Sequence, residues 1–83
     1  MELAEAEQTL LGAAEHVSIK LPDRGLGHKY VLNPEPYIEK QMKIFQILDP
    51  KKNAKIFEIG PGVGYFAFFC CAVGECEYTG QKR

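Results

Sequence analysis

The sequence predicts an α/β fold in which helices lead into one β-α-β unit with two parallel strands. The segment KIFEI, residues 55–59, is a short apolar run that ends at a cluster of glycines, which is typical of a strand. The apolar run YFAFFCCAV follows the glycines and fits a buried helix, and CEYTG follows as the next strand. Two strands joined through a crossover helix are expected to be parallel.

Length and charge narrow the class of protein. A chain of 83 residues supports at most one small domain. Ten basic and eleven acidic residues give a net charge of −1, so the sequence offers no electrostatic case for binding nucleic acid or an anionic membrane. The first residues are acidic where a signal peptide is basic, and the longest apolar run is far shorter than the roughly 20 residues of a membrane helix. We expect a soluble cytoplasmic protein.

The three cysteines, Cys70, Cys71 and Cys76, do not form a disulfide framework, because their number is odd and two are adjacent. A metal site is not expected either, since His16 and His28 are distant in sequence and no CxxC pair is present. We expect buried free thiols that act as small apolar side chains.

The first sixteen residues are rich in strong helix formers and predict an amphipathic helix. Its apolar face repeats at helical spacing: Leu3, Ala6, Leu10 and Ala14.

The stretch SIKLPDRGLGHKYVLNPEP breaks this helix with glycine and proline and predicts a connection, with a brief extended piece at Lys29 to Leu32. One interpretation is a plain linker. The other is a loop that folds over a ligand pocket with Tyr30 or His28 facing inward.

A second helix is expected to begin near Pro34 to Pro36, with Asn33 as its N-cap, and to end at Asp49. We therefore divide the chain into residues 1–33, a helix and a connecting loop, and residues 34–83, a helix followed by the β-α-β unit. The expected buried face of this second helix comprises Ile38, Met42, Phe45 and Leu48.

The β-α-β unit itself is expected to comprise a strand at Lys55 to Ile59, a helix at Tyr65 to Val73 and a strand at Cys76 to Gly80. In the helix, the residues expected on the sheet side are Phe66, Phe69 and Cys70.

Gly60, Gly62 and Gly64 follow the first strand directly. In a parallel sheet, ligands bind beyond the carboxyl ends of the strands, and glycine lets the backbone approach a ligand closely. With the N-terminus of the following helix, these glycines favour a carboxylate or a phosphate; the alternative is an ordinary turn. The dinucleotide pattern G-x-G-x-x-G/A can be fitted to Gly62, Gly64 and Ala67, but it leaves Gly60 unexplained.

The string IFEIGPGVGYF resembles the first motif of class I S-adenosylmethionine-dependent methyltransferases, an acid followed by G-x-G-x-G. Upstream, HKYVLNPEPYIEKQMKIFQILD resembles the helix that precedes their first strand, and GECEYTG resembles their second strand. The resemblance implies a Rossmann-like fold and S-adenosylmethionine as cofactor. It implies that Glu58 lies under the methionine part, which carries an ammonium, and that the glycines form a backbone loop against it. The implied cofactor-binding residues are Glu58, Gly60, Pro61, Gly62 and Gly64.

Two features depart from this family. Its second strand ends in an acid that holds the ribose, whereas Gln81 or Lys82 occupies that position here. The chain also holds only two of the family's strands, so we expect an incomplete Rossmann-like fragment, either the amino-terminal portion of a longer enzyme or a truncated product. No catalytic residue and no methyl acceptor is assigned, and a structural alternative for Glu58 is a turn cap.

Two other classes of function stay open. One is a truncated, non-catalytic module that associates with another chain, or with itself, through an exposed sheet edge. Because the other strands of the full fold are missing, apolar surface on the helix from Phe66 to Phe69 is expected to be uncovered as well. The other is a piece of a nicotinamide-dependent oxidoreductase.

Overall fold

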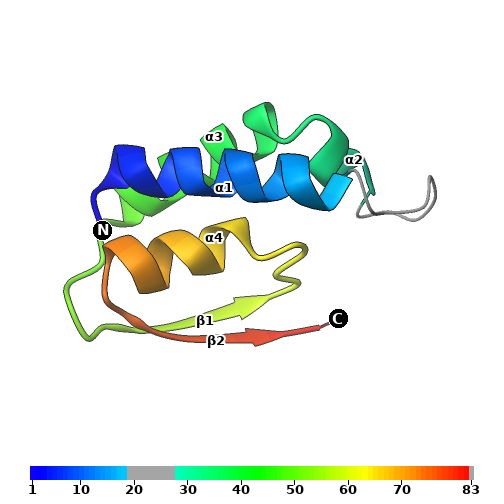
Figure 1. Ribbon diagram of the computed structural model, residues 1–83. Coiled ribbons are helices and arrows are strands. Elements are labelled where there is room, and N and C mark those ends of the chain that lie inside the picture. The colour runs from blue at the N-terminus through cyan, green and yellow to red at the C-terminus, as the bar shows by residue number, and fades with distance from the viewer. Residues whose placement is uncertain (19–27, 83) are drawn as a thin grey trace.

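Two parallel strands form a small sheet, and the helices all lie on one side of it (Figure 1). The computed structural model describes residues 1–18 and 28–82, so the middle of the predicted connecting stretch lies outside the described residues. Helix α4 lies next to the sheet, and α1 and α3 lie beyond it. The elements in chain order are α1 (Leu3–Ser18), α2 (His28–Leu32), α3 (Glu35–Leu48), β1 (Lys55–Ile59), α4 (Tyr65–Phe68), η1 (Phe69–Val73) and β2 (Glu77–Gln81).

The β-α-β unit is present with the predicted parallel pairing. Strand β1 has the expected bounds, and β2 begins and ends one residue later than expected. The register places Ile56 opposite Tyr78 and Ile59 opposite Gln81. The predicted helix between the strands is continuous, but its second half, η1, is a π-helix, in which the Gly74 N–H donates to the Phe69 carbonyl at 3.1 Å. The sequence therefore predicted the mixed α/β class correctly.

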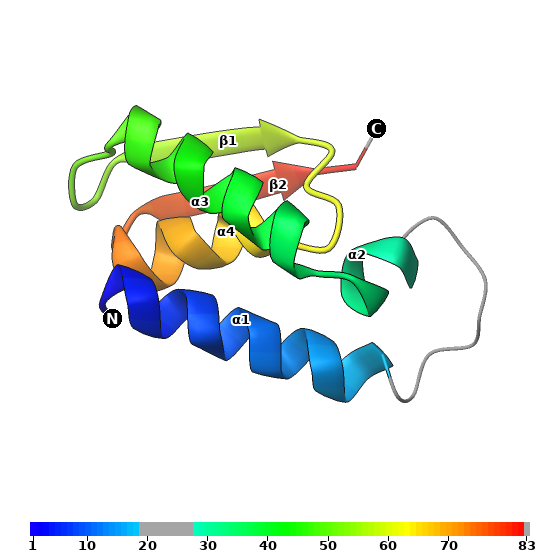
Figure 2. The same ribbon diagram turned by 90° about the horizontal axis from the view of Figure 1, so that it is seen from above.

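The core lies between α4–η1 and the two long helices; seen from above, α3 passes over α4 and α1 runs beside it (Figure 2). Phe66, Phe69 and Cys70 are buried as predicted. The ring of Phe69 stacks on Phe45 of α3, with centroids 6.1 Å apart, so this side chain packs against a helix. The expectation that the helix from Phe66 to Phe69 is uncovered is wrong, because α1 and α3 supply the cover.

Helix α1 presents the predicted apolar face, with Ala6, Leu10 and Ala14 buried. Helix α3 buries Ile38 and Phe45, also as predicted, and the Asp49 N–H closes it by donating to the Phe45 carbonyl at 2.9 Å. Leu48 was expected on the buried face but is 51% exposed. It is the last residue of α3, directly before Asp49, whose left-handed backbone ends the helix.

Two local predictions before α3 are wrong. Lys29 to Leu32 was expected to be extended, but the backbone there forms the short helix α2. Asn33 does not cap α3: Pro34 occupies the N-cap position, and no side chain bonds the first turn. The Pro34 carbonyl instead accepts hydrogen bonds from the N–H groups of Tyr37 and Ile38, at 3.1 and 2.9 Å.

All three cysteines are free thiols. Cys70 is buried, Cys76 is half-buried, and Cys71 is exposed, which contradicts the expectation that all three are buried. Burial raises the pKa of the Cys70 thiol from 9.0 to about 11, and the neighbouring thiols and Glu58 contribute less. Within the part of the chain that the structure describes, no helix combines the length and the apolar character needed to cross a membrane.

Candidate functional site

Successive side chains of β1 point to opposite faces of the sheet, and this alternation determines where Glu58 points. Ile56 and Glu58 are half-buried on the side of the helices, whereas Phe57 and Ile59 are exposed on the opposite face. An acid on the inner face, next to the last residue of the strand, is therefore held at the carboxyl end of the sheet. This is the edge at which parallel sheets bind their ligands.

The glycines after β1 form a loop that depends on left-handed backbone conformations. Gly60, Gly62 and Gly64 have φ values of 74, 60 and 89°, a region that residues with a Cβ rarely adopt. The Gly60 N–H donates to the Gln81 carbonyl at 2.8 Å, and the Gly64 N–H donates to the Pro61 carbonyl at 3.1 Å. The loop is thus fixed to the end of β2 and closed by a tight turn before α4.

The loop leaves space on one side. A Cβ atom built on Gly62 or on Gly64 would meet no atom within 4 Å. In the described part of the chain, no carbonyl accepts the N–H groups of Gly62 and Val63. The loop therefore combines backbone donors that have no backbone acceptor among the described residues with open space at Gly62 and Gly64.

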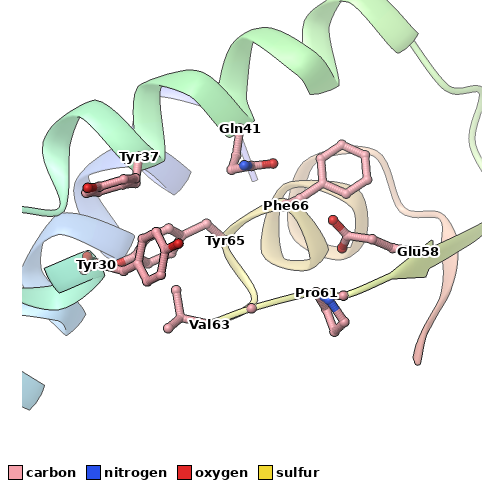
Figure 3. Close-up of a pocket in the computed structure, with 10 residues that line it drawn as sticks. Tyr30, Tyr37, Gln41, Glu58, Pro61, Val63, Tyr65 and Phe66 are labelled. Carbon is pink, nitrogen blue, oxygen red and sulfur yellow. Dashed lines mark hydrogen bonds between the residues drawn. The ribbon is translucent and has the colours of Figure 1, made fainter. Parts of the chain in front are cut away.

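A pocket of about 160 Å³ opens between this loop and the helices. Figure 3 shows Glu58 and Phe66 toward one end, Tyr30 and Tyr37 toward the other, and Gln41 extending from α3 between them. The residues that line the pocket come from α2, α3, β1, the loop and α4: Tyr30, Tyr37, Gln41, Glu58, Gly60, Pro61, Gly62, Val63, Tyr65 and Phe66.

Of the predicted site residues, Glu58, Gly60, Pro61 and Gly62 line the pocket; Gly64 belongs to the same loop but is not part of the lining. Tyr30 also lines it, which agrees with the interpretation that this stretch folds over a pocket. The side chain of His28 lies outside the described residues.

Sequence reasoning missed the residues that α3 and α4 contribute. Tyr37 and Gln41 are four residues apart on α3, so they share one face of the helix, and this spacing could have revealed them. Tyr65 fixes α2 to the site, because its hydroxyl donates to the Tyr30 carbonyl at 2.6 Å. Burial raises the pKa of Tyr65 above its usual value. The Tyr30 and Tyr37 rings meet edge to face, with centroids 4.6 Å apart.

Glu58 has a partner that the sequence did not suggest. The Tyr78 hydroxyl on β2 donates a hydrogen bond to Oε1 of Glu58. Burial, and next this bond to Glu58, hold the pKa of Tyr78 well above its usual range. Among the described residues, no backbone N–H donates to Glu58, so the alternative role as a turn cap is not observed.

The carboxyl end of β2 carries no acid. Gln81 pairs with Ile59, Lys82 follows it, and both side chains are exposed. Glu77 lies at the opposite end of the strand, beside Lys55. The carboxyl end of β2 therefore presents an amide and a lysine.

No group of three or more His, Cys, Asp or Glu side chains within residues 1–18 and 28–82 is arranged to hold a metal ion. No protein-family model, no curated protein and no solved structure matches this chain. The fold and the site by themselves define an α/β protein with a glycine loop and an acid beside a small pocket.

Proposed function

We propose that β1, the glycine loop and α4 form the S-adenosylmethionine-binding unit of a class I methyltransferase with a Rossmann-like arrangement. One observation carries this proposal: Glu58 points to the inner face at the end of β1, and the loop that follows has positive φ at all three glycines of the motif. Both features border the same pocket. An acid and a backbone loop are thus combined as the resemblance to this family implies.

The chemistry of the pocket fits the methionine end of the cofactor. The Glu58 carboxylate suits its ammonium, and the N–H groups of Gly62 and Val63 suit its carboxylate. A volume of about 160 Å³ is below the roughly 300–1,000 Å³ of pockets that enclose a whole ligand of this size. The nucleoside end would therefore extend past Gln81 and Lys82, where exposed side chains hold it only weakly.

When bound, the cofactor supplies a methyl group on a sulfonium. The residues of this chain would contribute orientation, since the loop and Glu58 fix one end of the ligand while the methyl group faces an acceptor. EIGPGVG is similar to the motif of ribosomal RNA adenine dimethyltransferases, but the near-neutral charge of the chain does not favour a nucleic-acid acceptor. The proposal therefore names the cofactor and leaves the acceptor open.

The loop geometry favours this ligand over a dinucleotide. The dinucleotide pattern uses Gly62, Gly64 and Ala67, and it assigns no role to Gly60. Gly60 nevertheless has a φ of 74° and bonds the end of β2. The acid-glycine motif includes this residue and accounts for the whole loop.

A titration monitored by NMR tests the proposal. We expect S-adenosylmethionine to bind the 83-residue chain with a dissociation constant of about 1 mM, which corresponds to roughly −4 kcal/mol. Chemical-shift changes should concentrate between Glu58 and Tyr65, and NAD should produce smaller ones. Equal changes with NAD, or no change with either ligand, would refute the proposal.

A second candidate function is association of the chain with another copy of itself through the sheet. The observation that favours it is the outer face of β1, where Phe57 and Ile59 are 59% and 61% exposed. Exposed apolar side chains on a two-stranded sheet favour pairing or stacking with another sheet. This candidate is compatible with ligand binding, because the pocket lies on the opposite face.

A further inference from the structure

Tyr78 connects the two strands by an oblique contact. It lies opposite Ile56, whereas the residue directly opposite Glu58 is Gly80. The Tyr78 hydroxyl nevertheless donates to Glu58 Oε1. The phenol ring therefore extends along β2, over the position of Gly80, to reach the acid on the neighbouring strand.

Gly80 provides the space for this contact. A Cβ atom at Gly80 would lie 3.0 Å from the Tyr78 hydroxyl oxygen and 3.1 Å from Cγ of Pro61, closer than such atoms normally approach. Unlike the glycines of the loop, Gly80 does not have a positive φ, so its backbone does not require glycine. Glycine is therefore needed at position 80 for a steric reason: any side chain there would meet the Tyr78 ring.

The bond leaves Glu58 able to bind a ligand. A phenol donates one hydrogen, whereas an ionised carboxylate accepts at about four lone-pair sites. Glu58 remains part of the pocket lining, close to Phe66 in Figure 3. A tyrosine hydroxyl is protonated at neutral pH, and the raised pKa of Tyr78 keeps this hydroxyl a donor further into the alkaline range.

We propose that Tyr78 is a positioning residue, whose hydroxyl holds the Glu58 carboxylate toward the pocket so that this carboxylate accepts a hydrogen bond from the ammonium of the bound ligand. The inference rests on the proposed function and extends it to a residue outside the glycine motif. The benefit is preorganisation: a carboxylate already fixed in its bound rotamer loses less side-chain entropy when the ligand arrives.

The test uses a matched pair of ligands, S-adenosylhomocysteine and its analogue without the amino group, S-adenosyl-4-thiobutyrate. Both are titrated by NMR into the wild-type chain and into Tyr78→Phe, which keeps the ring and removes the hydroxyl. We expect Tyr78→Phe to weaken the binding of S-adenosylhomocysteine about fivefold, because a Glu58 carboxylate without its partner loses more side-chain entropy when it binds the ammonium. Affinity for the analogue should not change, since it has no ammonium for Glu58.

Two further variants separate positioning from folding. Thr79→Val removes a hydroxyl from the next residue, which is exposed, and should change neither affinity. Gly80→Ala should weaken the binding of S-adenosylhomocysteine more than that of the analogue, because the added methyl group crowds the phenol that holds Glu58. A smaller loss common to both ligands is expected from its contact with Pro61 of the loop. Retained dispersion of the amide spectrum shows that each variant is folded.

The outcomes distinguish the two proposals. If the wild-type chain binds neither ligand, the proposed cofactor function is refuted, and the role of Tyr78 is refuted with it. If the wild-type chain binds and Tyr78→Phe has unchanged affinity, or loses affinity for both ligands equally, only the positioning role is overturned.

Discussion

The backbone of Gly60 donates a hydrogen bond to the carbonyl of Gln81 at 2.8 Å, which joins the start of the glycine loop to the last residue of β2. Because the two strands are parallel, their carboxyl ends meet at one edge, and the bond extends their pairing into the loop. The position of the loop is therefore fixed by β2, a strand that comes after the loop in the sequence. Changes in the loop are expected to alter binding more than folding.

Gly62→Val should abolish binding of S-adenosylmethionine in the NMR titration. Gly62 has a φ of 60°, which a β-branched residue adopts only with strain, and its missing side chain faces the open space of the loop. We expect a cost of about 1–3 kcal/mol in the free energy of unfolding. Denaturant titration measures this cost.

Gly12→Ala serves as the control for this variant. Gly12 lies in α1, and a Cβ there meets no atom within 4 Å. This change should stabilise the chain by roughly 0.5–1 kcal/mol and leave binding intact. Normal binding by Gly62→Val would show that the ligand does not approach the loop.

Phe69→Ala should destabilise the fold by about 3–5 kcal/mol, enough to unfold a chain of this size. Phe69 is fully buried and stacks on Phe45, so truncation leaves a cavity between α3 and η1. Circular dichroism during thermal unfolding measures the change. Phe57→Ala is the matched control, because Phe57 is 59% exposed and should lose little. Similar losses in the two variants would contradict the described core.

Stability should fall as the pH rises from about 9 to about 11. Burial raises the pKa of Cys70 from 9.0 to about 11, so in this interval the unfolded chain releases the thiol proton while the folded chain retains it. The contribution is complete below pH 9 and disappears as the pH passes the folded value. The raised pKa values of Tyr65 and Tyr78 act in the same direction above the ordinary tyrosine value of 10.0, so they add to the upper part of this interval.

Cys70→Ala isolates the thiol in this experiment. Denaturant midpoints measured across the alkaline range should decline less steeply in Cys70→Ala than in the wild-type chain. Cys71→Ala provides the control, since Cys71 is exposed. An alkaline decline of identical slope in all three chains would rule out the buried thiol as its cause.

Ile59→Lys should reduce self-association at high concentration. The side chain is 61% exposed on the outer face of β1, and a charge there opposes the approach of a second sheet. Analytical ultracentrifugation over a range of concentrations measures the effect. Ile47→Lys is the comparison, because Ile47 is 85% exposed but lies on α3. If only Ile47→Lys reduces association, the contact involves α3 and not the sheet.

Much of the fold could be predicted because it depends on local sequence patterns. The apolar spacing of Ala6, Leu10 and Ala14 indicates one face of α1, and the short run at Lys55 to Ile59 indicates β1. Helix α2 escaped prediction because a neighbouring element bonds its backbone. The Tyr65 hydroxyl bonds the backbone of α2, and such a contact has no signal in local spacing.

The candidate site likewise has a part that local sequence predicts and a part that only tertiary packing brings in. Glycines directly after a strand predicted the loop, because positive φ is a property of the residues themselves. Tyr37 and Gln41 join the site only because α3 packs beside the loop, and Tyr78 reaches Glu58 only because parallel register and Gly80 permit it. By itself, the sequence determined the order of the elements and the acid-glycine loop, through spacing and backbone preference. The tertiary structure decided which distant side chains surround that loop, because packing and strand register bring them together.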